Sequence, residues 1–330
     1  MSHWDNVKVV VTGAGGFIGS HLVERLLELG AGVTAFVRYN SRNDPGVLDL
    51  DGEDRRRLSL VPGEVREPET VRRLLRGADV VFHLAALVGI PYSYVHSNEV
   101  VEVNTIGTLN VLTAAKDADV KRVIVTSTSE VYGSALQVPI SEEHPKQPQS
   151  PYSASKIASD AIAMSFYHSF DLPVAVVRPF NTFGPRQSDR AIIPTIISQA
   201  LTKRQIQLGN TTPTRDFTYV SDTVEGILRV GECDAAVGEE INLGSGREIS
   251  IGELAEKIVA TVGTDVTISS RREERVRPKR SEVVRLLSDN SKAKRLLGWE
   301  PRVSLEQGLR LTVDWIRSNL GLYDPDTYRI

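Results

Sequence analysis

The sequence predicts an α/β protein in which a doubly wound parallel sheet carries a smaller C-terminal substrate-binding lobe. Two observations lead to this prediction. Up to about residue 178, short runs rich in β-branched residues alternate with stretches whose apolar residues recur at helical spacing. The runs are also apolar at nearly every position, as is typical of parallel strands covered by helices on both faces. The expected strands are Val7–Thr12, Val33–Arg38, Leu58–Val61, Val80–Leu84, Val123–Thr128 and Val174–Val177.

The stretches between these strands predict crossover helices over Phe17–Leu29, Thr70–Leu75, Ser97–Asp117 and Pro151–Phe170. After Pro179 the rhythm changes, and glycine and proline separate shorter elements. Helices are expected there over Ile192–Thr202, Ser221–Val230, Ile251–Val262, Ser291–Leu297 and Ser304–Asn319. The chain is therefore expected to divide into residues 1–178, which form the large sheet unit, and residues 179–330, which form the lobe. Glu240–Leu243 resembles a strand and could return to the large sheet.

Composition excludes several classes of function. The 330 residues include 39 Lys and Arg against 42 Asp and Glu, a net charge of −3, which argues against a nucleic-acid-binding surface. The most apolar window, Val80–Val95, is shorter than the roughly 20 residues of a membrane-spanning helix and contains His83. Asp5 and Lys8 interrupt any signal peptide. A single cysteine, Cys233, favours a reducing, cytoplasmic compartment.

Three glycines lie where the first expected strand meets the first expected helix. Gly13, Gly16 and Gly19, with Phe17 and Ile18 between the last two, form a Gly-x-x-Gly-x-x-Gly loop. Glycine has no Cβ to block the approach of a pyrophosphate, and the helix N-terminus supplies N–H donors and partial positive charge. The alternative is a tight turn without a ligand, but the position of the loop favours a dinucleotide-binding Rossmann unit.

The end of the second expected strand indicates which dinucleotide is bound. Where a Rossmann unit often has an acidic residue for the ribose hydroxyls, this chain has Arg38. A guanidinium suits a ribose 2′-phosphate, so NADP is favoured over NAD. NAD stays possible, because Arg38 could instead stack on adenine. The other residues expected along the cofactor are Asn40, Ser41, Glu64, Val65, Leu84, Ala85 and Ala86.

Tyr152 and Lys156 are candidate catalytic residues, because their spacing places a phenol and an ammonium on one face of a helix. The cation favours the phenolate, so Lys156 is expected to lower the pKa of Tyr152 and make it a usable base. Thr128, Ser129 and Glu130 follow the fifth expected strand and therefore reach the same edge of the sheet. The alternative for Glu130 is a solvated loop carboxylate.

Several motifs together resemble the extended short-chain dehydrogenase/reductase family, in its branch that modifies nucleotide sugars. The resemblance covers nearly the whole chain. The matching segments are Thr12–Gly19, His83–Ala86, Asn104 in Asn-Thr-Ile-Gly-Thr, the set Thr128, Tyr152 and Lys156, Arg178–Asn181, Arg215–Val220 and Leu297–Pro301. They are specific for the superfamily and less specific for the reaction.

Within that branch, Thr128-Ser129-Glu130 resembles the triplet of nucleotide-sugar 4,6-dehydratases, and UDP-glucuronate decarboxylases share a similar triplet. The strings that most resemble dehydratases of N-acetylglucosamine nucleotides in legionaminic-type pathways are Thr126–Gly133, Gln149–Lys156 and Arg178–Gln187. The missing acidic middle residue is a departure from the glucose dehydratases. A UDP-glucuronate decarboxylase or a nucleotide-sugar 4-epimerase is the alternative. A non-catalytic cofactor-binding protein is disfavoured, because Tyr152 and Lys156 are both present.

The resemblance implies roles for individual residues. Tyr152 takes the C4 hydroxyl proton, Thr128 bonds the C4 oxygen, and Glu130 takes the C5 proton. Ser129 is not a strong acid, so either Glu130 also protonates the leaving C6 hydroxyl or a water relays the proton. Asn104 is expected near the cofactor, and the substrate diphosphate is expected to meet Asn181, Arg215 and Arg277.

The remaining expectations concern metals and partners. His144 and His168 lack metal-ligand spacing, so no metal is predicted. The resemblance implies a homodimer formed through the expected helices Ser97–Asp117 and Pro151–Phe170. The expected partner is a nucleotide-diphosphate sugar, with no nucleic acid and no membrane.

Overall fold

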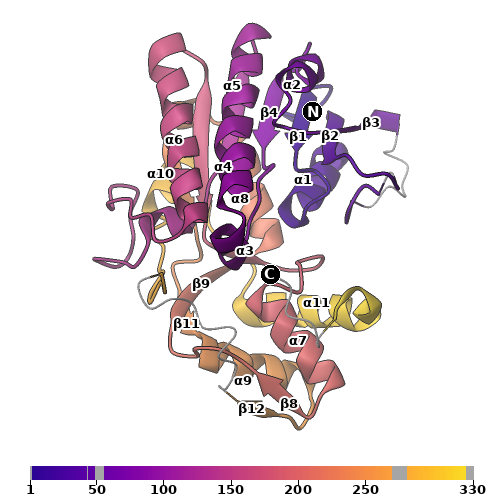
Figure 1. Cartoon of the computed structure of the whole chain (residues 1–330), viewed down its shortest axis with the longest axis vertical. Helices are drawn as coiled ribbons and strands as arrows, with labels where there is room; N and C mark the ends of the chain where they lie inside the picture. The colour runs from indigo at the N-terminus through magenta and orange to yellow at the C-terminus, as the bar shows by residue number, and fades with distance from the viewer. Residues whose placement is uncertain (1, 43, 49–55, 270–280, 325–330) are drawn as a thin grey trace.

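A computed structural model of the chain describes residues 2–42, 44–48, 56–269 and 281–324. Within these residues, seven strands pair in parallel in the order β10-β6-β5-β4-β1-β2-β3, so the predicted doubly wound sheet is confirmed (Figure 1). The strands are β1 (Lys8–Thr12), β2 (Gly32–Arg38), β3 (Leu58–Gly63), β4 (Val80–His83), β5 (Arg122–Thr126), β6 (Val174–Pro179) and β10 (Glu240–Leu243).

Helices cover both faces of the sheet. Successive strand residues point to opposite sides, so neighbouring residues of one strand enter different cores. Val9 and Val11 of β1 pack in the core that includes α1 (Phe17–Glu28) and α8 (Val220–Glu232). Val10 packs on the other side, with α2 (Pro68–Leu74), α5 (Gly107–Asp117) and α6 (Pro151–Phe170). This two-sided burial explains why the strands read as unbroken apolar runs.

The helix expected over Ser97–Asp117 is not regular. It comprises α4 (Ser97–Val101), a π-helical turn η2 (Glu102–Ile106) and α5. Within the π turn, the Asn104 carbonyl accepts hydrogen bonds from Thr108 Oγ1 at 2.6 Å and Ser159 Oγ at 2.7 Å. Side-chain hydroxyls of this kind compete with backbone donors for the carbonyl, and single π turns are frequent at functional sites.

The lobe lies at the carboxyl edge of the sheet (Figure 1). It contains α7 (Ile192–Thr202), α9 (Ile251–Val262) and α11 (Leu305–Ser318), with the strand groups β11-β9-β7 and β12-β8. These short strands are β7 (Asn181–Phe183), β8 (Gln205–Gln207), β9 (Thr214–Tyr219), β11 (Glu248–Ser250) and β12 (Thr267–Ser269). Elsewhere along the described chain, the short helices are α3 (Ile90–Val95), η3 (Ser129–Tyr132), η4 (Asp234–Ala236), α10 (Ser291–Leu297) and η6 (Leu320–Leu322).

Two elements after residue 179 belong to the large sheet unit. β10 pairs with β6, and α8 packs in the same core as α1. The expected division of the chain between residues 178 and 179 therefore stays a prediction, and these two later segments return to the large sheet unit. Among the described residues, no helix is both long and apolar enough to cross a bilayer.

Candidate active site

The glycine loop packs directly against the end of β4. Gly13 has φ +72°, and a Cβ there would come within 2.7 Å of the Ala85 nitrogen. A Cβ on Gly19 would come within 2.2 Å of the Gly13 carbonyl oxygen. The loop can therefore be this tight only with glycine at both positions. It forms one wall of a cleft of about 590 Å³.

This cleft brings together most of the residues predicted from the sequence. The predicted residues that line it are Gly13, Gly16, Phe17, Ile18, Gly19, Arg38, Asn40, Leu84, Ala86, Thr128, Ser129, Glu130, Tyr152, Lys156 and Asn181. Glu64, Val65 and Ala85 line a smaller pocket of about 130 Å³, which shares Gly13 and Arg38 with the cleft. One continuous site thus runs from the end of β2 to the end of β6.

Two predicted cofactor residues line neither of these pockets. Ser41 is exposed and lines neither pocket. Asn104 is completely buried, and its side chain bonds Leu87 and Ser155 instead of facing the cleft. The Asn104 side chain therefore links the loop after β4 to α6 through hydrogen bonds. Arg277 lies outside the described residues.

Asp44 is a cleft residue that sequence reasoning missed. Asp44 lines the large cleft together with Arg38 and Asn40. The Asn40 Oδ1 atom accepts from the Asp44 backbone N–H at 2.9 Å, which folds this segment back on itself. The Asp-Pro-Gly sequence that begins at Asp44 predicts a turn, and this was the feature from which the folding back of the segment could have been predicted.

The start of α6 fixes the position of Tyr152. Ser150 and Ser153 form a reciprocal capping box, with both N–H···Oγ distances at 3.0 Å, and Pro151 occupies the first turn. Tyr152 is the second residue of the helix, and its side chain is 7% exposed. The cap therefore sets where the phenol enters the cleft.

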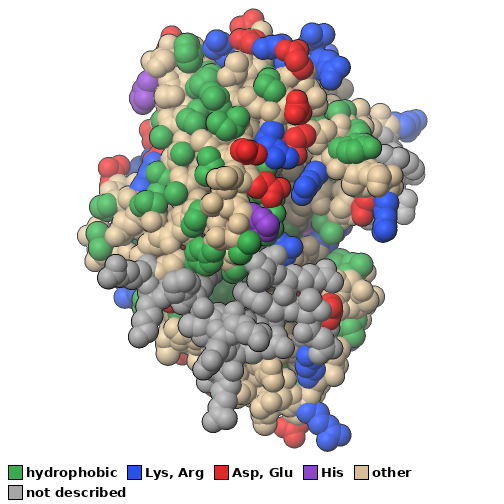
Figure 2. All heavy atoms as spheres, viewed as in Figure 1, with side chains coloured by type: hydrophobic (Ala, Val, Ile, Leu, Met, Phe, Trp, Pro, Cys, Tyr) green, Lys and Arg blue, Asp and Glu red, His purple; other side chains and the backbone are tan. Residues whose placement is uncertain are grey.

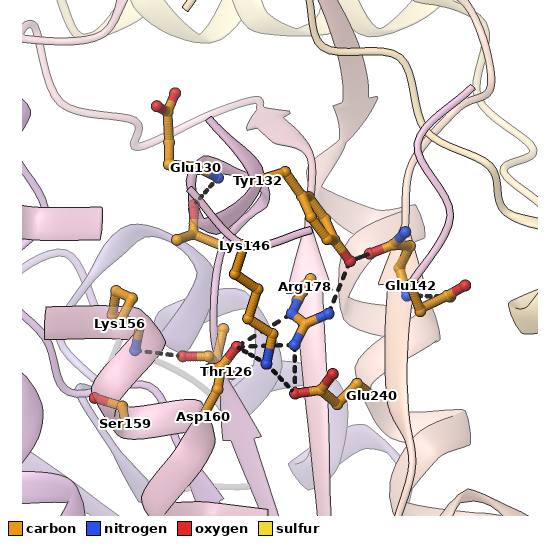
Figure 3. Close-up of polar contacts among 12 residues, drawn as sticks. Thr126, Glu130, Tyr132, Glu142, Lys146, Lys156, Ser159, Asp160, Arg178 and Glu240 are labelled. Carbon is orange, nitrogen blue, oxygen red and sulfur yellow. Dashed lines mark hydrogen bonds and ion pairs between the residues drawn. The ribbon is translucent and has the colours of Figure 1, made fainter. Parts of the chain in front are cut away.

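The pKa of Tyr152 is shifted in the direction opposite to the sequence expectation. Burial raises it, a hydrogen bond to Thr128 opposes this effect, and the carboxylates of Glu130 and Asp160 raise it further. Burial is the largest of these effects, and Lys156 Nζ donates to the Thr126 carbonyl at 2.7 Å (Figure 3). The buried Tyr152 side chain is therefore a neutral phenol at neutral pH.

Lys156 is also buried, at 3% exposure. Burial lowers the pKa of Lys156 to about 8, and the Asp160 carboxylate acts in the opposite direction. Desolvation disfavours a charged amine, so this lysine loses its charge only slightly above neutral pH. Its charge state is consequently sensitive to neighbouring groups.

Glu130 stands where two clefts meet. Its residue lines both the large cleft and a second one of about 340 Å³, and Asn181 and Thr182 also line both. Its carboxylate points away from the buried charges around Arg178 (Figure 3). The adjacent Ser129 is buried at 3% exposure. Glu130, the one acidic residue of the predicted triplet, is thus half-buried and lines both clefts.

The second cleft lies between the sheet edge and the lobe, and both described members of the predicted diphosphate-binding set line it. Asn181 comes from β7, and Arg215 comes from β9. One Arg215 nitrogen lies 4.0 Å from the carboxylate of Glu282, and another donates to the Thr214 carbonyl at 2.8 Å. Arg190 lines the same cleft. An anionic ligand between the lobe and the sheet would therefore meet arginine side chains.

The fold and the site define the class of protein, an extended short-chain dehydrogenase/reductase of the nucleotide-sugar dehydratase and epimerase type. Residues 10–312 match the family described as GDP-mannose 4,6 dehydratase, so the chain belongs to that family. The resemblance predicted from the sequence motifs is confirmed. Within the described residues, no group of three or more His, Cys, Asp or Glu side chains is arranged to hold a metal ion.

Similar proteins catalyse three different reactions. The chain is 32% identical to a UDP-glucose 4-epimerase of Mycolicibacterium smegmatis, over 94% of this chain and 99% of the relative. It is 34% identical to UDP-glucuronic acid decarboxylase 1 of Xenopus tropicalis, over 97% of this chain and 74% of the relative. The dTDP-glucose 4,6-dehydratase DesIV of Streptomyces venezuelae, solved with NAD bound, has a TM-score of 0.85 and 32% identity, over 97% of this chain and 99% of that one.

We predict that Gly13→Ala destabilises the protein more than Gly77→Ala and also abolishes dinucleotide binding. Both glycines have φ +72°, so an added Cβ costs each about 1–2 kcal/mol of backbone strain. Only Gly13 adds a collision with the β4 backbone, since nothing lies within 4 Å of a Cβ on Gly77. Urea unfolding and the fluorescence of bound NADPH or NADH measure the two effects. Equal losses in both variants would contradict this account of the loop.

Proposed function

We propose that the protein is a nucleotide-sugar 4,6-dehydratase, which converts a nucleotide-activated hexose to its 4-keto-6-deoxy derivative. The observation that carries this proposal is the position of Glu130, whose carboxylate joins the cleft that contains Tyr152 and Lys156 to the cleft lined by Arg215. Epimerisation at C4 requires no base at C5, whereas elimination of water requires one. Glu130 is suited to that role.

The proposed chemistry divides the proton transfers between two residues. A nicotinamide dinucleotide held along Gly13, Gly16 and Arg38 would supply reversible hydride transfer, from C4 of the sugar and back to C6, so that no external oxidant would be consumed. In its phenolate form Tyr152 takes the C4 hydroxyl proton, and Thr128, which bonds Tyr152, would hold the C4 oxygen. The 4-keto group acidifies the C5 hydrogen, Glu130 removes that proton, and the C6 hydroxyl leaves as water.

Protonation of the leaving hydroxyl is assigned to Glu130. Ser129 is buried and carries no ionisable acid, whereas Glu130 holds the C5 proton after the abstraction step. Transfer of this proton to the C6 oxygen, directly or through one water, completes the loss of water and leaves Glu130 ionised. When the hydride then adds to C6, a proton from solvent is added to C5, and Tyr152 releases the proton of the C4 hydroxyl to solvent, so the enzyme returns to its starting state. We also propose N-acetylglucosamine as the hexose, which is supported by the resemblance of the Thr126–Gly133 and Gln149–Lys156 strings.

The experiment is chromatographic separation followed by mass spectrometry of UDP-GlcNAc, GDP-GlcNAc, GDP-mannose, dTDP-glucose and UDP-glucuronate, each incubated separately with the protein. Loss of one water from one of them supports the proposal. An isomer of unchanged mass would indicate the epimerase alternative, and loss of carbon dioxide from UDP-glucuronate would indicate the decarboxylase. No reaction with any of these nucleotide sugars would leave the dehydratase proposal without support.

We predict that Glu130→Gln slows water loss by about 10²–10⁴-fold while the first hydride transfer still occurs. Reduced cofactor should then accumulate and be visible in the absorbance of the reduced nicotinamide. Tyr152→Phe should stop the cycle before any reduced cofactor forms. The exposed Glu143→Gln variant is the matched control and should react at the parent rate. A Glu130→Gln variant with parent turnover would remove this carboxylate from the mechanism.

For the cofactor, we propose NADP, with NAD as the alternative. Arg38 supports NADP, because it lines both the large cleft and the smaller pocket next to Glu64. Asp44 acts against it, because this acidic residue lines the same cleft and its negative charge would repel a 2′-phosphate. The balance between these two side chains decides the preference.

We predict that Arg38→Gln weakens NADPH binding by about tenfold or more and NADH binding only slightly, because a charge-assisted bond to the 2′-phosphate is lost. Asp44→Asn should strengthen NADPH binding. Fluorescence titration of the parent and both variants measures these changes. Tighter binding of NADH than of NADPH by the parent protein would refute the NADP proposal.

We also propose that the protein forms a homodimer through α4, α5 and α6, and acts in the reducing compartment suggested by its single cysteine. Hydrophobic side chains are spread over the face formed by these helices (Figure 2). Val101 and Ile106 are each 43% exposed there. Apolar patches on helices are frequent sites of association, and sedimentation equilibrium distinguishes the dimer from a monomer.

A further inference from the structure

A buried cluster of charges lies beside the candidate catalytic helix (Figure 3). Arg178 of β6 and Asp160 of α6 are completely buried. Arg178 donates two hydrogen bonds to Asp160 Oδ2, from Nε at 3.1 Å and from Nη2 at 3.0 Å. Glu240 of β10 pairs with Arg178 and accepts from Lys146 at 2.7 Å. The charges of the two cations, Arg178 and Lys146, thus balance those of the two carboxylates, Asp160 and Glu240. None of these four residues has a role in the chemistry proposed above.

Asp160 occupies a special position in this cluster. It lies four residues after Lys156 on α6, so both side chains project from the same face of the helix. Both donors from Arg178 reach Oδ2, and Lys146 Nζ lies 4.0 Å from the same atom. Among the described residues, Asp160 Oδ1 is buried and has no hydrogen-bond partner. A buried carboxylate oxygen without a partner keeps much of its negative charge unscreened.

We propose that Asp160 is a positioning residue that keeps the buried Lys156 side chain in its ammonium form, and that the pair formed by Lys146 and Glu240 adjusts how strongly it does so. The proposal deepens the proposed function, on which it rests for the role of Lys156. A protonated Lys156 supplies the positive charge that a Tyr152 phenolate needs in a buried site. Without the carboxylate, desolvation would strip that charge near neutral pH.

Other groups near Lys156 do not supply the negative charge. On α6 itself, Tyr152 is a neutral phenol. On β4, burial lowers the pKa of His83 to about 3, so it is neutral at working pH. On β6, Arg178 is a cation and opposes the lysine charge. Of the carboxylates, Glu130 points away from the cluster, and Glu240 is held by Arg178 and Lys146 (Figure 3).

The balance of the cluster predicts effects of opposite sign. Asp160→Asn removes the nearest negative charge and should destabilise the ammonium form of Lys156. Lys146→Met removes a cation that partly neutralises Asp160 and should stabilise that form. Because Lys146 is 29% exposed, the second variant disturbs the core less than the first. A purely structural role of Asp160 would not produce shifts in opposite directions.

The test measures the protonation of Lys156 directly in the ligand-free protein. Trace acetylation with acetic anhydride, read by mass spectrometry of the Lys156 peptide from pH 6 to 11, reports the fraction of neutral amine. Lys156 is only 3% exposed but lines the large cleft, which is the route by which the small reagent would reach its amine. The parent midpoint is expected near pH 8. Lys257, which is on the surface, is the internal reference.

In Asp160→Asn we expect the midpoint to fall by about one pH unit, the usual scale for loss of a neighbouring charge. In Lys146→Met we expect it to rise. The control variant Glu143→Gln should leave it unchanged. An unchanged midpoint in Asp160→Asn, or a shift in the same direction in both variants, would overturn the proposal. If Asp160→Asn fails to fold by circular dichroism, an unchanged or lower midpoint in Lys146→Met overturns it.

A kinetic measurement separates this proposal from the proposed function. With a nucleotide sugar that reacts, the alkaline limb of the kcat/KM pH profile should move to lower pH in Asp160→Asn and to higher pH in Lys146→Met. If no nucleotide sugar reacts with the parent protein, the proposed function fails. The acetylation midpoints then still decide whether Asp160 holds the charge of Lys156.

Discussion

The parallel pairing of all seven described strands of the large sheet is the constraint on which the rest of the structure depends. Because the strands run in one direction, every segment that follows a strand emerges at the same edge. The glycine loop follows β1, Arg38 ends β2, the Thr128–Glu130 triplet follows β5, and Asn181 follows β6. The site is therefore assembled by topology, from segments that are far apart in the sequence. The lobe closes over this edge and adds Arg215 from β9.

Burial at this edge creates an electrostatic problem that the charge cluster addresses. A site that excludes water makes Tyr152 a weaker acid and Lys156 a weaker base, because each charged form loses its hydration. A buried carboxylate can restore the lysine charge, but it would be costly without partners. Arg178 supplies hydrogen bonds to one oxygen of Asp160 and leaves the other unpaired. The cluster thereby stabilises the carboxylate without cancelling its effect on Lys156.

Most of the fold and the glycine loop could be predicted from the sequence, because periodicity and local spacing determine them. The π turn at Glu102–Ile106 could not, because one hydroxyl that bonds the Asn104 carbonyl comes from Ser159 on another helix. Asp44 was missed because its place in the cleft depends on a tertiary contact, Val47 N–H to the Gly15 carbonyl at 3.0 Å, that holds its loop over the glycines. The pKa direction of Tyr152 was predicted wrongly, because spacing shows that Lys156 is near but not how deeply the phenol is buried.

The central claim is that Glu130 removes a proton from C5 while the hydrogen of C4 stays within the enzyme. Turnover in heavy water, followed by NMR of the first product formed, tests this claim most directly. The account predicts a 4-keto-6-deoxy sugar with one deuterium at C5 and with the hydrogen originally on C4 now at C6. An epimerised sugar of the original composition that carries no solvent deuterium would contradict it.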